Sequence, residues 1–208
     1  MRDKFNSKMI YVGCCTLVAV TLLVQPTYLA KAQVEAVRAG VVELPRGPIT
    51  RIPSPDRHWT LIFECPDLSK ERKLWVEDSS SHARKLVKEY ERSLAIAWAP
   101  DSERFFVNDD YGSNGSLSYV IEPATLKTID LRAIIVGSDA KATQFLGAGH
   151  SYLRSKQWLS SHELLVAMFG HFDGSPARGF PARFTLKYRV DLNGHAQKIF
   201  EASVEEPQ

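Results

Sequence analysis

Cysteine is scarce in this sequence: there are three in 208 residues, and two of them, Cys14 and Cys15, are adjacent near the N-terminus. That scarcity excludes a small secreted domain held together by a disulfide framework. An excess of one charge is also lacking, because 26 basic residues are matched by 24 acidic ones. Nucleic-acid binding therefore has no electrostatic support. The remaining composition, 44% apolar and 24% charged, excludes a disordered chain, a collagen-like polymer and a polytopic membrane protein.

Only one long apolar run is present, the 16 uncharged residues 9–24. It follows a basic segment and is shorter than the roughly 20 residues that span a bilayer. Residues 30–32, AKA, then supply the small-x-small pattern of a cleavage site. We therefore expect residues 1–32 to be a signal peptide cleaved after Ala32, which places the protein in the periplasm or outside the cell without a membrane anchor. An uncleaved anchor is the alternative.

Without residues 1–32, the chain has 22 basic and 23 acidic residues, so its net charge is near −1. Cys65 is then the only cysteine, and a lone thiol cannot form an internal disulfide. We expect Cys65 to be a small core residue, with an intermolecular bridge as the alternative.

Short segments rich in β-branched and aromatic residues, separated by turn residues, follow the leader at residues 33–52. Such segments are typical of strands, so we expect a single all-β domain over residues 53–208. The leader has at most two short strands, around 41–44 and 49–52. Residues 81–92 are compatible with a helix or a strand. The strands expected in the domain are 60–65, 74–77, 84–87, 94–98, 104–108, 117–122, 127–131, 163–169, 183–191 and 197–202.

These strands fall into groups that look like copies of one another. Pro55 and Pro100, each followed by Asp, are 45 residues apart, and Trp75 and Tyr119 in the next strand of each group are 44 apart. A third copy starts at Trp158, where WLSS matches the WAPD of residues 98–101 without its Pro-Asp. A period near 43–45 residues with about four short strands is the pattern of a propeller blade.

Residues 98–107, WAPDSERFFV, resemble the W-S-P-D-G-K-x-L-A-F/V signature of the WD40-like repeats in TolB-type β-propellers, and residues 54–63, SPDRHWTLIF, form a second copy. The resemblance covers about residues 50–203 and implies β-propeller-like, four-stranded antiparallel units. It also implies that Asp56 and Asp101 are turn residues of the scaffold rather than catalysts.

The sequence departs from that family in three ways. Arg57 and Ser102 replace the glycine that follows Pro-Asp, and residues 137–155 and 170–181 are extra irregular segments of the third unit. About three units are visible, whereas closed propellers have at least four blades. We therefore expect an incomplete or open fold, unless a homodimer completes a ring. A β-sandwich of unrelated meanders is the alternative.

Asp109, Asp110 and Asn114 are candidate binding residues in the turn-rich segment DDYGSNGS. Their oxygens suit a hard cation, but an EF-hand register that starts at Asp110 places Gly112 and Ile121 at ligand positions. We expect a solvated loop and no metal site.

His150, His171 and Asp173 are weak catalytic candidates in glycine-rich segments. A His–Asp pair with a serine is hydrolase chemistry. However, the sequence has no G-x-S-x-G elbow and no H-E-x-x-H pair among its six histidines. The non-catalytic interpretation, in which these are polar residues of loops, is favoured.

We therefore expect an exported, non-catalytic binding protein that needs no cofactor and recognises a protein or an envelope component through residues 137–155 and 170–181, because rigid β scaffolds commonly carry function on loops. A secreted hydrolase that uses the histidine candidates is one alternative. A membrane-tethered structural subunit is the other.

Overall fold

The computed structural model describes residues 40–66, 72–172 and 183–204, all of which belong to one compact unit, Ala36–Gln208. The predicted signal peptide at residues 1–32 and the catalytic candidate Asp173 lie outside the described residues. No helix in the described ranges has the length and apolarity to cross a membrane.

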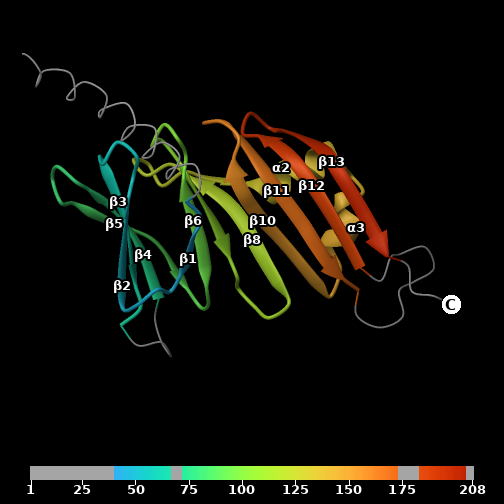
Figure 1. The fold of residues 1–208 in the computed structure, drawn as a ribbon, viewed down its shortest axis with the longest axis horizontal. Helices are drawn as coiled ribbons and strands as arrows, with labels where there is room; N and C mark the ends of the chain where they lie inside the picture. Colours follow the sequence, from blue (N-terminus) through green and yellow to red (C-terminus); the bar gives the residue numbers. More distant parts are fainter. Residues whose placement is uncertain (1–39, 67–71, 173–182, 205–208) are drawn as a thin grey trace, which may run out of the picture. The chain divides into compact units, whose positions relative to one another are not determined.

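The described residues form thirteen strands and two short helices (Figure 1). The all-β prediction is confirmed, with the helices as additions to it. The elements are β1 (Val42–Leu44), β2 (Ile49–Pro53), β3 (Trp59–Glu64), β4 (Arg72–Asp78), β5 (Arg84–Tyr90), β6 (Leu94–Trp98), β7 (Phe105–Asp109), β8 (Gly115–Ile121), β9 (Thr128–Asp130), α2 (Leu131–Ser138), α3 (Ala142–Leu146), β10 (His150–Trp158), β11 (Glu163–His171), β12 (Arg183–Asp191) and β13 (His195–Val204).

The strands after β1 form three consecutive antiparallel units of four, β2–β5, β6–β9 and β10–β13. The first unit is a separate sheet. The second and third share one nine-stranded sheet, because β10 pairs in parallel with β8 and β1 adds to the free edge of β6. Neither sheet closes into a ring within the described residues, so the prediction of an open fold is confirmed.

The Pro-Asp turn has the same structure in the first two units. Asp56 accepts the amide of His58 at 2.9 Å, and Asp101 accepts the amide of Glu103 at 3.1 Å. Each carboxylate thus folds the chain back on itself two residues later, as aspartates do in turns. Both aspartates therefore have the scaffold role that the repeat pattern implies.

The residue after each of these aspartates adopts a left-handed backbone. The φ angle is 64° at Arg57 and 68° at Ser102, a region that favours glycine. This is the position at which the repeat signature has glycine. The local backbone is therefore kept although the glycine is absent.

Tryptophan indoles join successive units in the same way. Trp98, at the end of β6, donates its Nε1–H to the carbonyl of Ile52 in β2 at 3.1 Å. Trp158, at the end of β10, donates to the carbonyl of Ala97 in β6, also at 3.1 Å. The first strands of the three units are therefore linked by equivalent hydrogen bonds, which unrelated meanders would not share.

Two cores lie on opposite faces of the second unit. One contains Phe63 and Leu74 from the first unit with Phe105 from β7. The other contains Phe106 from β7 with side chains of α2, α3 and β10–β13. Strands β6 and β7 are buried at every position, because a strand between two packed layers exposes neither face. Cys65 lies in the first of these cores.

Residues 137–155 are not the irregular segment that the sequence predicted. They contain the end of α2, all of α3 and the first part of β10. Helix α2 begins where Asp130 accepts the amide of Arg132 at 2.8 Å, a typical N-cap, and it buries Leu131 and Ile135 four residues apart. The ambiguous residues 81–92 contain strand β5.

Candidate binding site

The outer face of the third unit is the side of β10–β13 that points away from the core formed with α2 and α3. Alternation along each strand decides which residues lie there: Leu153, Met168 and Leu186 point into the core, so the residues next to them point outward. The registers align the outward residues in three rows, namely His150, His171, Arg183 and Val204; Tyr152, Phe169, Thr185 and Ala202; and Arg154, Ala167, Lys187 and Phe200.

These three rows combine basic and aromatic side chains and contain no Asp or Glu. Tyr152 and Phe169 stack with ring centroids 5.2 Å apart. Lys156 lies over the Phe169 ring at 5.5 Å, and Lys187 lies over the Phe200 ring at 5.0 Å. Such cation–π pairs hold ammonium groups above aromatic rings at a surface.

The pKa of Lys156 is affected by the positive charges near it on this face. Desolvation by burial lowers the pKa of Lys156, and the positive charges of Arg154 and Lys187 lower it further, although Glu43 opposes them. Like charges disfavour the protonated amine. An anion placed here would therefore relieve repulsion that the protein itself does not fully neutralise.

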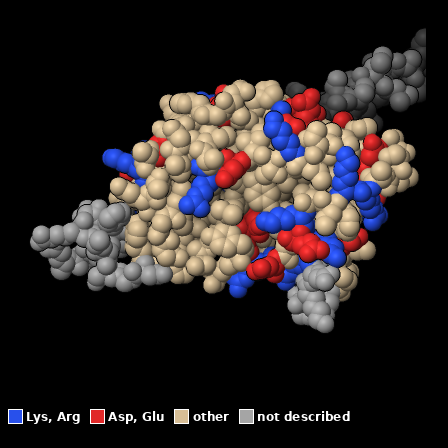
Figure 2. All heavy atoms as spheres, turned by 180° about the vertical axis from the view of Figure 1, so that it is seen from behind, with Lys and Arg blue, Asp and Glu red and all other residues tan. Residues whose placement is uncertain are grey.

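Charge is distributed differently elsewhere. On the face shown in Figure 2, Lys and Arg lie among Asp and Glu, and no wide area carries one sign. The gathering of basic residues in the three rows is thus not repeated on that face.

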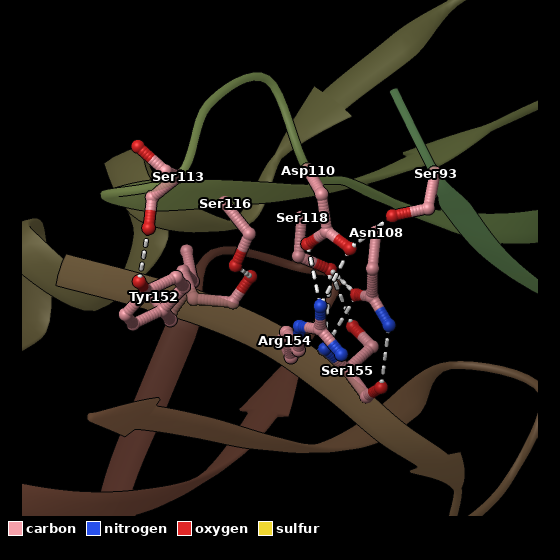
Figure 3. A network of polar contacts seen from close by, with 10 residues as sticks. Ser93, Asn108, Asp110, Ser113, Ser116, Ser118, Tyr152, Arg154 and Ser155 are labelled. Atoms are coloured by element: carbon pink, nitrogen blue, oxygen red, sulfur yellow. Dashed lines mark hydrogen bonds and ion pairs between the residues drawn. The ribbon is translucent and has the colours of Figure 1, made fainter. Parts of the chain in front are cut away.

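The β7–β8 loop lies against the first strand of this face (Figure 3). The Tyr152 hydroxyl donates to the carbonyl of Ser113 at 2.6 Å, and the Ser151 amide donates to the carbonyl of Asn114 at 3.0 Å. These bonds bring the loop that contains the candidate Asn114 next to the start of β10, where the candidate His150 lies. The loop and His150 are separated by about 40 residues of sequence.

Both loop carboxylates are held by cations of the protein. Arg154 Nη2 lies 2.6 Å from both oxygens of Asp110, and the Ser93 hydroxyl donates to the same carboxylate (Figure 3). Asp109 is buried and pairs with Lys88 at 2.9 Å. The described residues hold no group of three or more metal-ligating side chains. These carboxylates therefore fix the loop to β5 and β10, and their charges are already matched.

The histidine candidates do come together. His150 and His171 are directly opposite each other in β10 and β11, and their rings stack with centroids 4.1 Å apart. Ser151 alternates with His150 along β10, so its hydroxyl points to the other side of the strand. Within the described ranges the structure thus pairs the two imidazoles without a serine beside them, and their role in catalysis stays a prediction.

Sequence reasoning missed a buried polar network between the second and third units (Figure 3). The side-chain amide of Asn108 accepts the Ser155 amide at 2.8 Å and donates to the Ser155 carbonyl at 2.9 Å. The Ser118 hydroxyl contacts both side chains at 2.8 Å. Asn108 thereby acts as a strand partner for β10. Its only sequence signal is an amide that directly follows three apolar residues of β7.

A shallow, open depression of about 400 Å³ lies elsewhere, between the end of α2 and β13. The carboxylate of Asp139, in its wall, accepts from the Tyr188 hydroxyl at 3.0 Å and pairs with Lys198 at 3.3 Å. Burial alone would raise the pKa of Asp139, but these two partners outweigh it and hold the pKa below its usual value. The carboxylate therefore has a structural role.

No family model and no curated protein matches this sequence. Solved β-propellers are similar to it at low identity. The β-propeller domain of the Trilobed protease from Pyrococcus furiosus shares 15% identity over 74% of this chain and 43% of its own, with a TM-score of 0.47. TolB from Acinetobacter baumannii shares 15% identity over 77% of this chain and 34% of its own, with a TM-score of 0.40. The acylaminoacyl peptidase of Pyrococcus horikoshii shares 14% identity over 74% of this chain and 25% of its own, with a TM-score of 0.42.

The four-stranded units are propeller-type repeats. Their equivalent turns, strand orders and indole hydrogen bonds already indicate this. The chain spans less than half the length of each of these three proteins.

Proposed function

We propose that this protein is an exported, non-catalytic binding protein that recognises an acidic segment of a partner protein on the outer face of the third unit. The observation that carries the proposal is the gathering of basic and aromatic side chains in the three rows, which contain no Asp or Glu. The outward acids of the strands, Glu163 and Asp191, lie at the other end of β11 and β12, and Glu163 pairs with Arg189. Oppositely charged surfaces steer partners together and suppress wrong ones.

The face offers two kinds of contact to such a partner. Lys156, Arg183 and Lys187 supply positive charge, since Arg154 is already paired with Asp110. Phe200 and Val204, which are 44% and 62% exposed, supply apolar area for side chains that alternate with the carboxylates. An extended acidic segment suits a flat sheet face, because strand residues present their side chains at regular spacing.

A binding role fits the groups present better than catalysis does. Ammonium and guanidinium groups and aromatic rings hold a ligand but are poor proton acceptors at neutral pH. Export is supported by the basic segment, short apolar run and AKA pattern of residues 1–32. Intact mass of the secreted protein tests the export part, since retention of residues 1–32 would contradict cleavage.

The binding part is tested with a labelled decapeptide of alternating Glu and Phe, followed by fluorescence anisotropy at low and at physiological salt. Lys156→Glu with Lys187→Glu should weaken binding at least tenfold. The matched control is Lys127→Glu with Lys141→Glu, which makes the same charge change at exposed lysines outside the three rows. Equal loss in both double variants, or no binding by the unmodified protein, would contradict the proposal.

A further inference from the structure

Strand β13 is the last strand of the nine-stranded sheet, and among the described residues it pairs only with β12 (Figure 1). Its first half is held by α2, where the amide of Ala196 donates to the hydroxyl of Ser138 at 2.8 Å. The register with β12 shifts just before Phe200, and the ladder then runs without interruption to Val204. All residues of this second half, Phe200–Val204, are exposed. We call this segment the β13 edge.

Exposed strand edges are normally protected from pairing with other chains by short length, charged side chains or proline. The other outermost strands of the two sheets follow this rule. Strands β1 and β9 have only three residues each, β2 contains Arg51 and Pro53, and four of the seven residues of β5 are charged. The β13 edge has a single charge, Glu201, and no proline. It is therefore the least protected edge in the part of the chain that the structure describes.

The side chains of the β13 edge alternate between the two sides of the sheet. Glu201 lies opposite Leu186, which points into the core, so its carboxylate is on the core side, where it pairs with Lys198 at 2.6 Å. The outward side chains include Phe200 and Val204, which are apolar and exposed. A strand added at this edge would therefore meet apolar side chains, and no carboxylate, on its outer side.

Positive charge lies on β12, directly beside the β13 edge. Lys187 is opposite Phe200 and holds its ammonium nitrogen 5.0 Å from the centre of the Phe200 ring. Arg183 is opposite Val204. A strand added beside β13 would lie one strand spacing, about 4.8 Å, from it. Carboxylates on the outer side of such a strand would therefore reach the Lys187 ammonium across the Phe200 ring.

We infer that the acidic segment binds as an additional antiparallel strand, hydrogen-bonded to the β13 edge, with its carboxylates on the outer side beside Lys187 and Arg183. This inference rests on the proposed function and adds how the segment is held. Main-chain hydrogen bonds at the edge supply affinity, and the alternating side chains supply specificity. Antiparallel pairing is the more stable arrangement per residue, and it continues the order of β11, β12 and β13.

A segment that lay across the whole outer face would depend on Lys156 as much as on Lys187. Lys156 lies over the ring of Phe169 in β11. A strand added beside β13 would be three strand spacings, or about 14 Å, from β11. That separation exceeds the screening length of about 8 Å at physiological salt. Edge binding and face binding therefore differ in which lysine they need.

The first test uses two N-methylated forms of the labelled Glu-Phe decapeptide, one methylated on three Glu amides and the other on three Phe amides. Amides along a strand point alternately to its two sides, so only one of these sets can donate to β13. By fluorescence anisotropy, methylation of one set should weaken binding at least fivefold, and methylation of the other, matched in number, less than twofold. Equal effects of the two sets would overturn the inference and leave the proposed function intact.

Single charge reversals give a second readout with the unmethylated peptide. Lys187→Glu alone should account for most of the tenfold loss expected of the double variant, whereas Lys156→Glu, its matched control on the same face, should weaken binding less than twofold. Circular dichroism checks that the sheets of both variants are intact. Equal losses would place the segment across the face and overturn the inference.

The remaining alternative occupant of the β13 edge is a second copy of this chain. Analytical ultracentrifugation at the assay concentration should show a monomer with and without peptide. A dimer that the peptide dissociates would assign the edge to a second copy and overturn the inference. No binding of the unmethylated peptide would contradict the proposed function and this inference together.

Discussion

Arg57 and Ser102 occupy equivalent turn positions with the same left-handed backbone but differ in their surroundings. Arg57 is exposed. Ser102 is buried, and its hydroxyl accepts the amide of Asp56 in the neighbouring unit at 3.0 Å. The serine thus makes a contact between units that offsets the strain of its backbone.

Arg57→Gly should therefore raise the free energy of unfolding by about 0.5–1 kcal/mol, because the left-handed strain of roughly 1–2 kcal/mol exceeds the entropic cost of glycine. Ser102→Gly relieves the same strain but loses a hydrogen bond with a net value of about 1 kcal/mol. Urea unfolding of both variants measures the contrast. Equal gains in both would contradict the role given to the serine hydroxyl.

Gly170 is required by the close approach of β10 and β11. Gly170→Ala should lower the free energy of unfolding by about 1–3 kcal/mol, the usual cost of overpacking, because the new β-carbon meets the backbone of His150. The control is Gly137→Ala in α2, where no atom lies within 4 Å of the added carbon. That change should stabilise the protein by about 1 kcal/mol, since alanine favours a helix. Thermal unfolding compares the two.

At the scale of elements, β10 is held to the second unit by a side chain rather than by a complete strand ladder. Asn108→Ala should cost about 2–3 kcal/mol, because it leaves a buried carbonyl and amide of Ser155 without their best partner. Asn114→Ala, at an exposed loop position, should change stability by less than about 0.5 kcal/mol. Similar effects of the two changes in urea unfolding would show that the network is not structural.

The turn between β4 and β5 depends on Asp78. Hydrogen bonds from the Ser80 hydroxyl and from the amides of Ser81 and Ser80 lower the pKa of Asp78 to about 2. A lowered pKa means that the folded state binds fewer protons than the unfolded state. The stabilisation is therefore complete above the unfolded pKa of about 4 and is lost as pH falls through about 2.

Asp78→Ala should consequently destabilise the protein at pH 6 and have a much smaller effect at pH 2.5. Urea unfolding of both proteins at the two pH values gives this difference. A pH-independent effect of the substitution would mean that the ionised carboxylate does not stabilise the turn.

At the scale of the molecule, the second unit shares one core with the first and another with the third. Unfolding either neighbour would expose one face of strands that are otherwise completely buried. We therefore expect a single cooperative transition rather than three separate ones. Hydrogen exchange followed by mass spectrometry should give the same maximum free energy for β4 and β12. A clearly lower value for β12 would indicate that the third unit opens alone.

The sequence predicted most strands because their signals are local. The Pro-Asp turns and the alternation in residues 183–191 depend on neighbours along the chain, and the period near 45 residues is the recurrence of such local signals. Strand β10 was missed because Leu153 is its only large residue buried in the core. Helix α2 was missed although Asp130 precedes Leu131 and Ile135 at helical spacing, which is a start signal that the strand assignment of 127–131 concealed.

The candidate site could be predicted only in part. His150, His171, Asp110 and Asn114 were singled out by residue type, but nothing in the sequence places the loop beside β10 or makes Arg154 the partner of Asp110. Those residues are 44 positions apart, and their meeting depends on the parallel pairing of β8 with β10. The outer face was not predicted, since its rows appear only once the strand registers are known.

The amino-acid order alone decided the turns, the repeated units and the all-β class, because each of these follows from interactions between residues that are close in the chain. The tertiary structure decided which charges are neutralised, which rings stack and where basic and aromatic side chains gather on the third unit. Those properties depend on register between strands, where a shift of one residue would turn every outward side chain into the core.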